Sequence, residues 1–94
     1  MRRRRRTRAP GSAAPRYPDI LKSAGIEGNV FASFVVDTSG HVEPRSFTVL
    51  LATHELFVAA VRNALPKMKF FPAEVGGKKV KRLVQQPFVF SIAR

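Results

Sequence analysis

The sequence predicts an α+β fold: a three-stranded antiparallel sheet in the order 2-1-3, with two helices packed on one face. The predicted elements run helix, strand, strand, helix, strand, which is an α+β order. A right-handed crossover through the second helix then places the third strand beyond the first. Pro44 and Pro87 fall on the two outer strands and the middle strand has no proline, as expected because proline cannot donate to a central ladder.

The composition limits the protein to one small domain with a basic N-terminal segment. The chain has 94 residues and no cysteine, so it has neither a disulfide nor a thiolate metal site. Its net charge is +11, but seven arginines lie within residues 1–16. Residues 17–94 hold ten Lys and Arg against six acidic residues, a net charge of +4. The folded part is therefore expected to be only mildly basic.

The boundary of the folded domain is predicted at Tyr17. Residues 1–16 are rich in Arg, Pro, Gly, Ser and Ala, and we expect a disordered Arg-rich tail because they have almost nothing to bury. No stretch approaches the roughly 20 apolar residues of a membrane-spanning helix, and no apolar run follows the charged N-terminus as in a signal peptide. Residues 17–94 are expected to form the domain.

Residues 18–24 are predicted to form a short helix. Pro18 fits a first turn, Asp19 suits the positive end of the helix dipole, and Gly25 can adopt the left-handed conformation that ends a helix. A helix of this length depends on packing rather than on propensity. We expect Tyr17 and Leu21 to share its buried face because they lie four residues apart.

Residues 29–51 are predicted to form a β-hairpin. Residues 29–36 alternate between two faces, one of them apolar: Val30, Ala32, Phe34 and Val36. Asp37-Thr38-Ser39-Gly40 is a typical turn, since Asp can bond its own backbone and Gly accepts a positive φ. The return strand, residues 42–51, should alternate at Phe47, Val49 and Leu51. Val42 is out of phase with them, so we expect a β-bulge at Glu43-Pro44-Arg45.

Residues 53–65 are predicted to form the main helix and residues 80–92 the last strand. Thr53 is the expected N-cap and Pro66 ends the helix, whose buried stripe comprises Leu56, Phe57, Ala60, Val61 and Ala64. Residues 67–75 should cross irregularly, with Met68 and Phe70 beneath the sheet, before a turn at Gly76-Gly77. In the last strand Val84, Gln86, Phe88, Phe90 and Ile92 share one face, and Leu83, Gln85, Pro87 and Val89 share the other.

Residues typical of catalysis and metal binding are sparse. His41 and His54 lie thirteen apart and are interpreted as exposed polar residues. No cluster of His, Cys and Asp has the spacing of a metal site, and no serine has an evident base nearby in the sequence. We therefore expect no enzyme, no catalytic residue, no metal and no cofactor.

The last strand carries the candidate binding site. Pro87 marks it as an edge strand, whose outer N–H and C=O groups can pair with an added extended peptide. Gln85 and Gln86 could add side-chain contacts, and the basic residues before them could steer an acidic or polar segment. The candidate partner-binding residues are Arg82, Leu83, Val84, Gln85, Gln86, Pro87, Phe88 and Val89. The same edge predicts self-association into a homodimer.

Two basic segments support a rival interpretation, an Arg-tailed nucleic-acid-binding domain. Arg2 to Arg6 and Arg8 could hold nucleic-acid phosphates or anionic lipid. Lys78-Lys79-Val80-Lys81-Arg82 could meet an acidic partner or keep a strand entry solvated. Nucleic acid is the less favoured partner because residues 17–94 lack an aromatic-basic stacking motif. Loss of binding on deletion of residues 1–16 would identify this rival.

Several motifs, taken in order from Tyr17 to Ile92, resemble one known family. They are Tyr17-Pro18, Gly25-Ile26-Glu27-Gly28, Asp37-Thr38-Ser39-Gly40, Phe70-Phe71-Pro72-Ala73 and Gln86-Pro87-Phe88-Val89-Phe90. Together they resemble the C-terminal domain of the TonB family, the energy transducers of the Gram-negative envelope. An envelope-linker domain of the TolA kind is a related alternative.

The resemblance implies the same α+β fold and a periplasmic domain without enzymatic activity. Such a domain grips the N-terminal segment of outer-membrane TonB-dependent receptors by β-strand addition, and supports active transport of nutrients such as siderophores. Full-length members are anchored in the inner membrane, where another segment meets a proton-channel complex. This chain contains no such anchor, so we expect a fragment or an unusual stand-alone domain.

The sequence departs from the family pattern at three places. Leu21 stands where a small Ala is common, and Leu51-Ala52-Thr53 stands where Ser-Ser-Gly is often found. Met68 stands where a Trp is common, which predicts a looser fit beneath the sheet.

Overall fold

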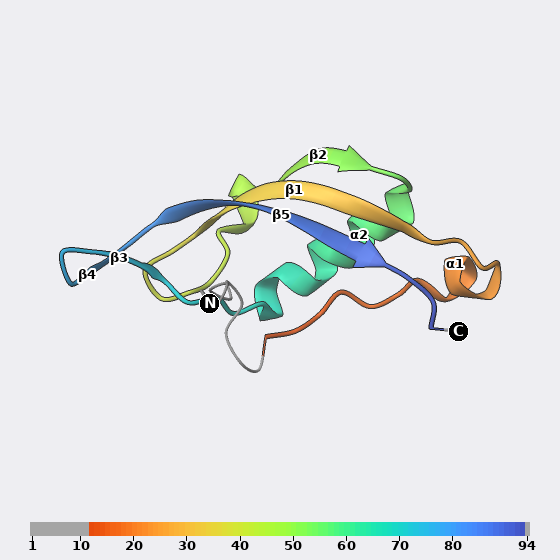
Figure 1. Ribbon diagram of the computed structural model, residues 1–94, viewed down its shortest axis with the longest axis horizontal. Coiled ribbons are helices and arrows are strands. Elements are labelled where there is room, and N and C mark those ends of the chain that lie inside the picture. The colour runs from red at the N-terminus through yellow and green to blue at the C-terminus, as the bar shows by residue number, and fades with distance from the viewer. Residues whose placement is uncertain (1–11, 94) are drawn as a thin grey trace, which may run out of the picture.

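The central sheet has three antiparallel strands in the order β2-β1-β5 (Figure 1). The computed structural model describes residues 12–93. The strands of this sheet are β1 (Gly28–Val36), β2 (Thr48–Ala52) and β5 (Arg82–Phe90), and the helices are α1 (Asp19–Ser23) and α2 (Glu55–Ala64). The predicted α+β fold with strand order 2-1-3 is confirmed, since β5 is the third strand of the sheet.

The core lies between the sheet and α2, which crosses one face of it (Figure 1). The inward side chains of β1 are almost fully buried, and Phe57 of α2 stacks on Phe90 with ring centroids 4.4 Å apart. Tyr17 meets both rings edge-to-face. Met68 and Phe70 are buried as predicted. Each large apolar side chain buried in this way stabilises the fold by about 1.5–3 kcal/mol.

The first helix and the turn after β1 agree closely with the predictions made from the sequence. α1 begins after Pro18, buries Leu21 and is followed by Gly25 at φ +71°. In the turn, Asp37 Oδ1 accepts hydrogen bonds from the N–H groups of Ser39 and His41. Gly40 has φ +89°, a backbone conformation that is strained for a residue with a side chain. Both local predictions are confirmed.

The predicted continuous return strand, residues 42–51, is wrong. Val42 forms only an isolated bridge to Val36, Pro44–Ser46 is a 3-10 helix, and β2 starts at Thr48. The reason is local chemistry. Pro44 has the fixed φ that suits a first helical position, and Ser46 Oγ accepts the Val35 N–H at 2.8 Å. The Ser46 hydroxyl thus takes the place of a strand carbonyl as the acceptor for the Val35 N–H. Pro44 lies in the 3-10 helix and not in the edge strand.

The bulge lies in β2 rather than at residues 43–45. The register between β1 and β2 shifts at Leu50, so that Leu51 faces Phe31 while Val49 faces Ala32. Residues that face each other across two strands share one side of the sheet. Val49 therefore packs on the core, whereas Leu51 is 70% exposed on the open face. The expectation that Phe47, Val49 and Leu51 alternate as one set is wrong at Leu51.

α2 begins two residues later than predicted, and Thr53 is not its N-cap. His54 is the cap, with Nδ1 accepting from the Leu56 N–H at 3.0 Å. Thr53 instead bonds the main chain of Asn29, so its hydroxyl is engaged with β1. Of the predicted stripe, Phe57, Val61 and Ala64 are buried, and Leu56 is partly exposed. A 3-10 turn, Leu65–Lys67, continues the helix through Pro66.

A second sheet was not predicted. β3 (Ala73–Val75) and β4 (Lys78–Val80) form an antiparallel hairpin around Gly76 and Gly77. The expected irregular crossing therefore ends at Pro72, and the expected last strand is divided into β4 and β5. Both glycines have positive φ, +59° and +80°, which is the geometry of a two-residue type I′ hairpin loop.

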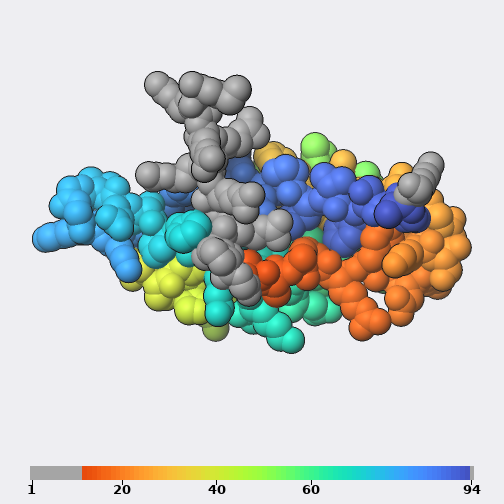
Figure 2. Space-filling view, turned by 60° about the horizontal axis from the view of Figure 1, so that its bottom comes forward, coloured from red at the N-terminus to blue at the C-terminus, as the bar shows by residue number. Residues whose placement is uncertain are grey.

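The N-terminal segment is described from Ser12 onward. The disorder expected for residues 1–16 falls, for residues 1–11, outside the described part of the chain. Ser12 Oγ accepts the Lys69 N–H at 3.0 Å, and the Ala13 N–H donates to the Lys67 carbonyl at 3.2 Å. Figure 2 shows this segment in red-orange between β5 in blue and α2 in teal. The domain boundary at Tyr17 stays a prediction that truncation can test.

None of the helices between residues 12 and 93 has the length and apolar character needed to cross a membrane.

Candidate functional site at the edge of the sheet

The outer side of β5 is the longest open edge among the described residues. β5 pairs with β1 over nine consecutive residues, from Gly28 opposite Phe90 to Val36 opposite Arg82. No described strand pairs with its other side. The eight predicted partner-binding residues therefore all lie on an edge strand, as Pro87 indicated.

The main chain of β1 shows which β5 groups point outward. Val35 donates its N–H to Ser46 Oγ and accepts from the Glu43 N–H, and Asn29 bonds Thr53 in the same direction. Odd-numbered β1 residues therefore direct their main chain toward β2. Even-numbered residues direct theirs toward β5, because this direction alternates along a strand.

The regular register carries this alternation onto β5. Even-numbered β1 residues face even-numbered β5 residues, so Arg82, Val84, Gln86 and Phe88 bond β1. The outward main-chain groups are the N–H and C=O of Leu83, Gln85 and Val89, and the C=O of Pro87. Proline has no N–H to offer, and its place in the outward set means that no bond in the β1–β5 ladder is lost.

The same alternation divides the side chains. Leu83 and Val89 are 65% and 71% exposed on the open face of the sheet, whereas Val84 and Phe88 are buried beneath it. Gln85 is exposed on the open face, and Gln86 is half-buried on the core side. Only Gln85 of the two glutamines lies on the open face of the sheet.

Residues 14–17 face the C-terminal half of the β5 edge. A groove of about 230 Å³ separates the two, with residues 87–91 on one side and Ala14, Pro15 and Tyr17 on the other. Ala14, Pro15 and Tyr17 form the N-terminal wall of this groove. The Tyr17 hydroxyl donates to the Ile26 carbonyl, which fixes the wall next to α1. Sequence reasoning missed this wall. The closely spaced Pro15 and Pro18, which favour extended backbone, were the available signal.

A second groove, of about 430 Å³, lies on the other side of the N-terminal segment. It separates residues 13–19 from the alanine-rich surface of α2, including Ala59, Ala60 and Ala64. It does not reach β5, so it is distinct from the edge.

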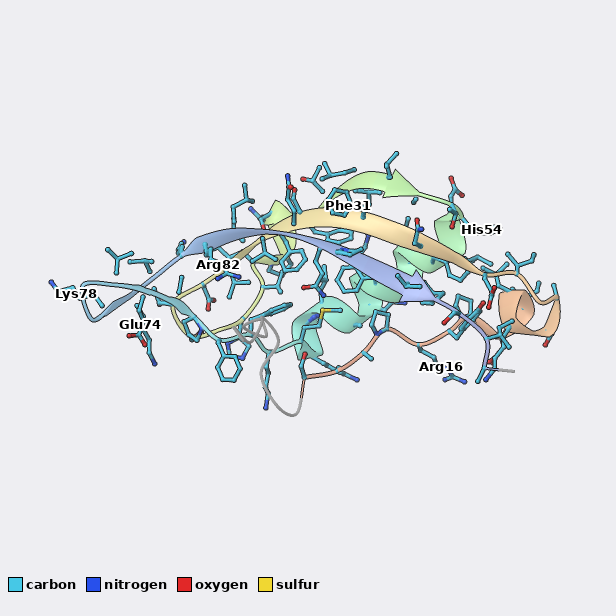
Figure 3. The ribbon with its side chains drawn as sticks, in the orientation of Figure 1. Arg16, Phe31, His54, Glu74, Lys78 and Arg82 are labelled. Carbon is cyan, nitrogen blue, oxygen red and sulfur yellow. The ribbon has the colours of Figure 1, made fainter. Side chains whose placement is uncertain are left out.

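An ion pair lies at the start of β5. Lys81 Nζ lies 2.6 Å from Glu43 Oε2, and the hydrogen bond and charge of Glu43 raise the pKa of Lys81. The pair joins the residue before Arg82 to the segment before the Pro44–Ser46 turn. Figure 3 shows Arg82 where β5 leaves the hairpin.

The polar side chains of the β1 turn form a structural cluster. Asp37 Oδ1 lies 2.7 Å from Ser39 Oγ, which also lies 3.0 Å from His41 Nδ1. Bonds to Ser39 and His41 hold the pKa of Asp37 below its ordinary value. A nucleophilic serine needs a base that a third group orients, and here the carboxylate bonds the serine itself. In the described part of the chain, no group of three His, Cys, Asp or Glu could hold a metal ion.

Comparison with known proteins adds independent evidence. Residues 13–92 match the family described as the Gram-negative bacterial TonB protein C-terminal. The chain is 31% identical to Protein TonB of Pseudomonas aeruginosa over 80 residues. That match takes in 85% of this chain and 23% of the Pseudomonas protein, so the chain spans about a quarter of its relative.

Solved structures agree with the fold. The solution NMR structure of the Pseudomonas aeruginosa TonB CTD superposes with a TM-score of 0.74 at 32% identity, over 88% of this chain and 83% of that one. The NMR solution structure of the Helicobacter pylori TonB-CTD gives 0.54 at 25% identity, over 85% and 71%. The motifs, the sheet order and these matches agree, and the chain belongs to the TonB C-terminal domain family.

Proposed function

We propose that this domain binds the N-terminal segment of an outer-membrane TonB-dependent receptor by adding it to the sheet beside β5. The observation that carries the proposal is a regular nine-residue edge with outward main-chain groups at Leu83, Gln85 and Val89. Main-chain pairing supplies affinity with little demand on sequence, which suits a module that serves several receptors.

The β5 edge has two parts that differ in how many main-chain hydrogen bonds they offer to an added strand. Leu83 and Gln85 each offer an outward donor and acceptor, so an added strand gains its densest pairing there. Opposite Pro87 the added strand meets a carbonyl alone. Farther on it enters the groove between residues 87–91 and residues 14–17, where Val89 offers the next donor.

The wider role follows from family membership. We infer a periplasmic domain, without enzymatic activity, of an energy transducer anchored in the inner membrane. It transmits force that supports active transport of nutrients such as siderophores, and another part of such a protein meets the proton-channel complex. The TonB family match over residues 13–92 supports this role.

An NMR titration with a receptor-derived N-terminal peptide tests strand addition. Amide shifts should concentrate on residues 82–89. Gln85→Pro should weaken binding about tenfold because it removes an outward donor and places a ring at the edge, whereas Gln85→Ala, which keeps the N–H, should weaken it about twofold. Shifts confined to α2 or to the Asp37–Gly40 turn, with residues 82–89 unaffected, would exclude this mechanism.

The same edge supports a homodimer as a competing occupant. A second copy can pair its own β5 with this edge, since open strands are templates for other chains. Sedimentation at millimolar concentration should show a dimer that Gln85→Pro reduces and that the receptor peptide displaces. A strictly monomeric profile under these conditions would contradict the homodimer and leave the peptide site untouched.

A further inference from the structure

The short strand β4 runs directly into β5. Only Lys81 separates the end of β4 at Val80 from the start of β5 at Arg82, and this residue lies in neither a turn nor a bend. Figure 1 shows the two segments running into one another, with the β3–β4 hairpin at one end of the molecule. Residues 78–90 therefore form one extended stretch of chain that is longer than β5 alone.

The hairpin loop shows which main-chain groups of β4 point outward. The loop has two residues, so Val75 and Lys78, which flank it, exchange main-chain hydrogen bonds with each other. Even-numbered residues of β4 therefore direct their main chain to β3, just as even-numbered residues of β5 direct theirs to β1. Because the alternation continues through the single residue between the strands, the N–H and C=O groups of Lys79 and Lys81 point to the other side.

β3 and β1 thus lie on the same side of this stretch. A separate contact agrees, since the Phe70 N–H donates to the Gly40 carbonyl at 2.9 Å, in the turn that follows β1. A Cβ on Gly40 would overlap the Phe70 carbonyl oxygen, so the chain that leads into β3 is packed tightly against this turn. Among residues 12–93, no strand pairs with the opposite side of β4 or β5. The open edge therefore continues from Val89 to Lys79.

The two lysines with outward main-chain groups already have acidic neighbours. Lys81 Nζ lies 2.6 Å from Glu43 Oε2, and Lys79 faces Glu74 across the hairpin. Residues that face each other across two strands share one side of the sheet, so each of these lysines has a carboxylate on its own side. This face of the extension is therefore close to neutral.

The other face of the extension carries two basic side chains without an acidic neighbour. Lys78 lies at the tip of the hairpin and Arg82 at the start of β5, and both are exposed (Figure 3). They face Val75 and Val36 in the two registers, and neither takes part in an ion pair between described residues. Because side chains alternate along a strand, the half-buried Val80 lies between them on the same face.

We propose that the binding edge extends from β5 onto β4, and that it takes an extended peptide segment with a carboxylate that faces Val80. The proposal rests on the strand addition argued above and lengthens the edge by the outward groups of Lys79 and Lys81. A side chain that faces Val80 has Lys78 and Arg82 as diagonal neighbours, at about 7–8 Å, which long side chains can reach. A carboxylate at that position therefore meets two positive charges.

The carboxylate also sets the register of the bound segment. Main-chain pairing alone allows an added strand to slip, because its hydrogen bonds repeat along the edge. Residues 83–90 contain no charged side chain, so an acidic residue of the peptide gains nothing there. Charge at one end of the edge thus selects one alignment out of several that the main chain would accept.

An NMR titration of the full chain with synthetic peptides tests this proposal. The probes are peptides of Thr, Val and Ser that match the edge in length, with a single Glu near the N-terminus or near the C-terminus, and their counterparts with Gln in its place. One Glu peptide should bind about threefold more tightly than its Gln counterpart, which is the size expected for exposed ion pairs. It should shift the amides of Lys79 and Lys81 together with those of Leu83 and Gln85.

Two charge variants locate the carboxylate. With Lys78→Gln/Arg82→Gln, the Glu peptide and its Gln counterpart should bind equally. The matched control is Lys22→Gln/Arg45→Gln, which removes the same charge at exposed positions elsewhere and should keep the difference between the peptides. Salt at about 0.15 M limits the comparison to near neighbours, because it screens charges more than about 8 Å apart. The carboxylate site is overturned if the difference survives in the first variant or is lost equally in both.

A second pair of variants tests the main-chain part of the extension. Lys79→Pro and Lys79→Gln remove the same charge, but only proline removes the outward N–H, which gives no bond to β3. Lys79→Pro should therefore bind the Glu peptide several-fold more weakly than Lys79→Gln. Equal affinities, with amide shifts confined to residues 83–89, would overturn the extension and leave strand addition at β5 intact. Absence of shifts throughout residues 79–89 would overturn both.

Discussion

The two edges of the sheet are built in different ways. β2 has five residues and slips register at Leu50, and side chains of Ser46 and Thr53 complete the bonding of β1 beyond it. β5 has nine residues and pairs with β1 without irregularity. Short and bulged strands are poor templates for another chain, whereas long regular ones are good templates. The β2 edge is therefore a poor template for an added strand, and the β5 edge, above all at residues 82–86, is a good one.

The largest expected effect is the difference in stability between two proline substitutions in β5, one at an N–H that points to β1 and one at an N–H that points outward. Gln86→Pro removes a donor that points to β1, so the free energy of unfolding should fall by about 3 kcal/mol. Gln85→Pro alters only the outward side and should cost about 1 kcal/mol or less. Urea unfolding of both variants measures the difference. Equal losses would mean that the alternation assigned to β5 is wrong.

Substitution of Ser46 tests how the hydrogen bonds on the β2 side of β1 are satisfied beyond the end of β2. Its Oγ accepts the Val35 N–H at 2.8 Å and donates to the Glu43 carbonyl at 2.6 Å. Ser46→Ala leaves the partly buried Val35 donor without this partner and should lower the free energy of unfolding by about 1–2 kcal/mol. Ser91→Ala, at an exposed position after β5, should stay within about 0.5 kcal/mol and serves as the control. A similar small change for Ser46→Ala would show that solvent or the backbone replaces the hydroxyl.

The contrast between the edges also explains what the sequence could predict. β1 was predictable because strict alternation around Phe34 leaves one choice of face, and Pro87 identified β5 as an edge. The slip at Leu50 was not predictable, since Val49, Leu50 and Leu51 are all apolar and fit either register. The outward set at Leu83, Gln85 and Val89 depends on the register between β1 and β5 and on the direction of the β1 main chain. The sequence alone therefore did not separate the eight candidate residues into inward and outward ones.

Other differences arise from tertiary contacts that override local signals. His54 caps α2 although Thr53 is the more usual cap, because the Thr53 hydroxyl is bonded to Asn29 of β1. The β3–β4 hairpin has strands of three residues, too short to show alternation, and only its glycines were visible in the sequence. Such features need the packed neighbours before they can be assigned.

Removal of residues 1–15 tests whether the N-terminal wall of the groove beside β5 contributes to stability or to peptide binding. A chain that starts at Arg16 loses the bonds of Ser12 and Ala13, and should match the full chain within about 1 kcal/mol in thermal unfolding. Its affinity for a receptor peptide should change little if pairing is concentrated at Leu83 and Gln85. A larger loss of stability would mean that residues 1–15 are part of the folded unit.

The smallest expected effect concerns the turn where the β2 side departs from regular pairing. Hydrogen bonds from Ser39 and His41 hold the pKa of Asp37 below its ordinary value of 3.8. In the unfolded chain Asp37 therefore takes up its proton at a higher pH than in the fold. The stabilisation from its charge is present above pH 4 and is lost as pH falls through the lowered pKa.

Asp37→Asn isolates this contribution, because the amide oxygen can still accept the turn bonds but carries no charge. Wild type should be slightly more stable than the variant from pH 5 to 7, and the difference should shrink steadily below pH 4. Thermal unfolding of both proteins across this range is the measurement. A gap that stays constant down to pH 2 would mean that the charge of Asp37 contributes nothing and that the turn relies on hydrogen-bond geometry alone.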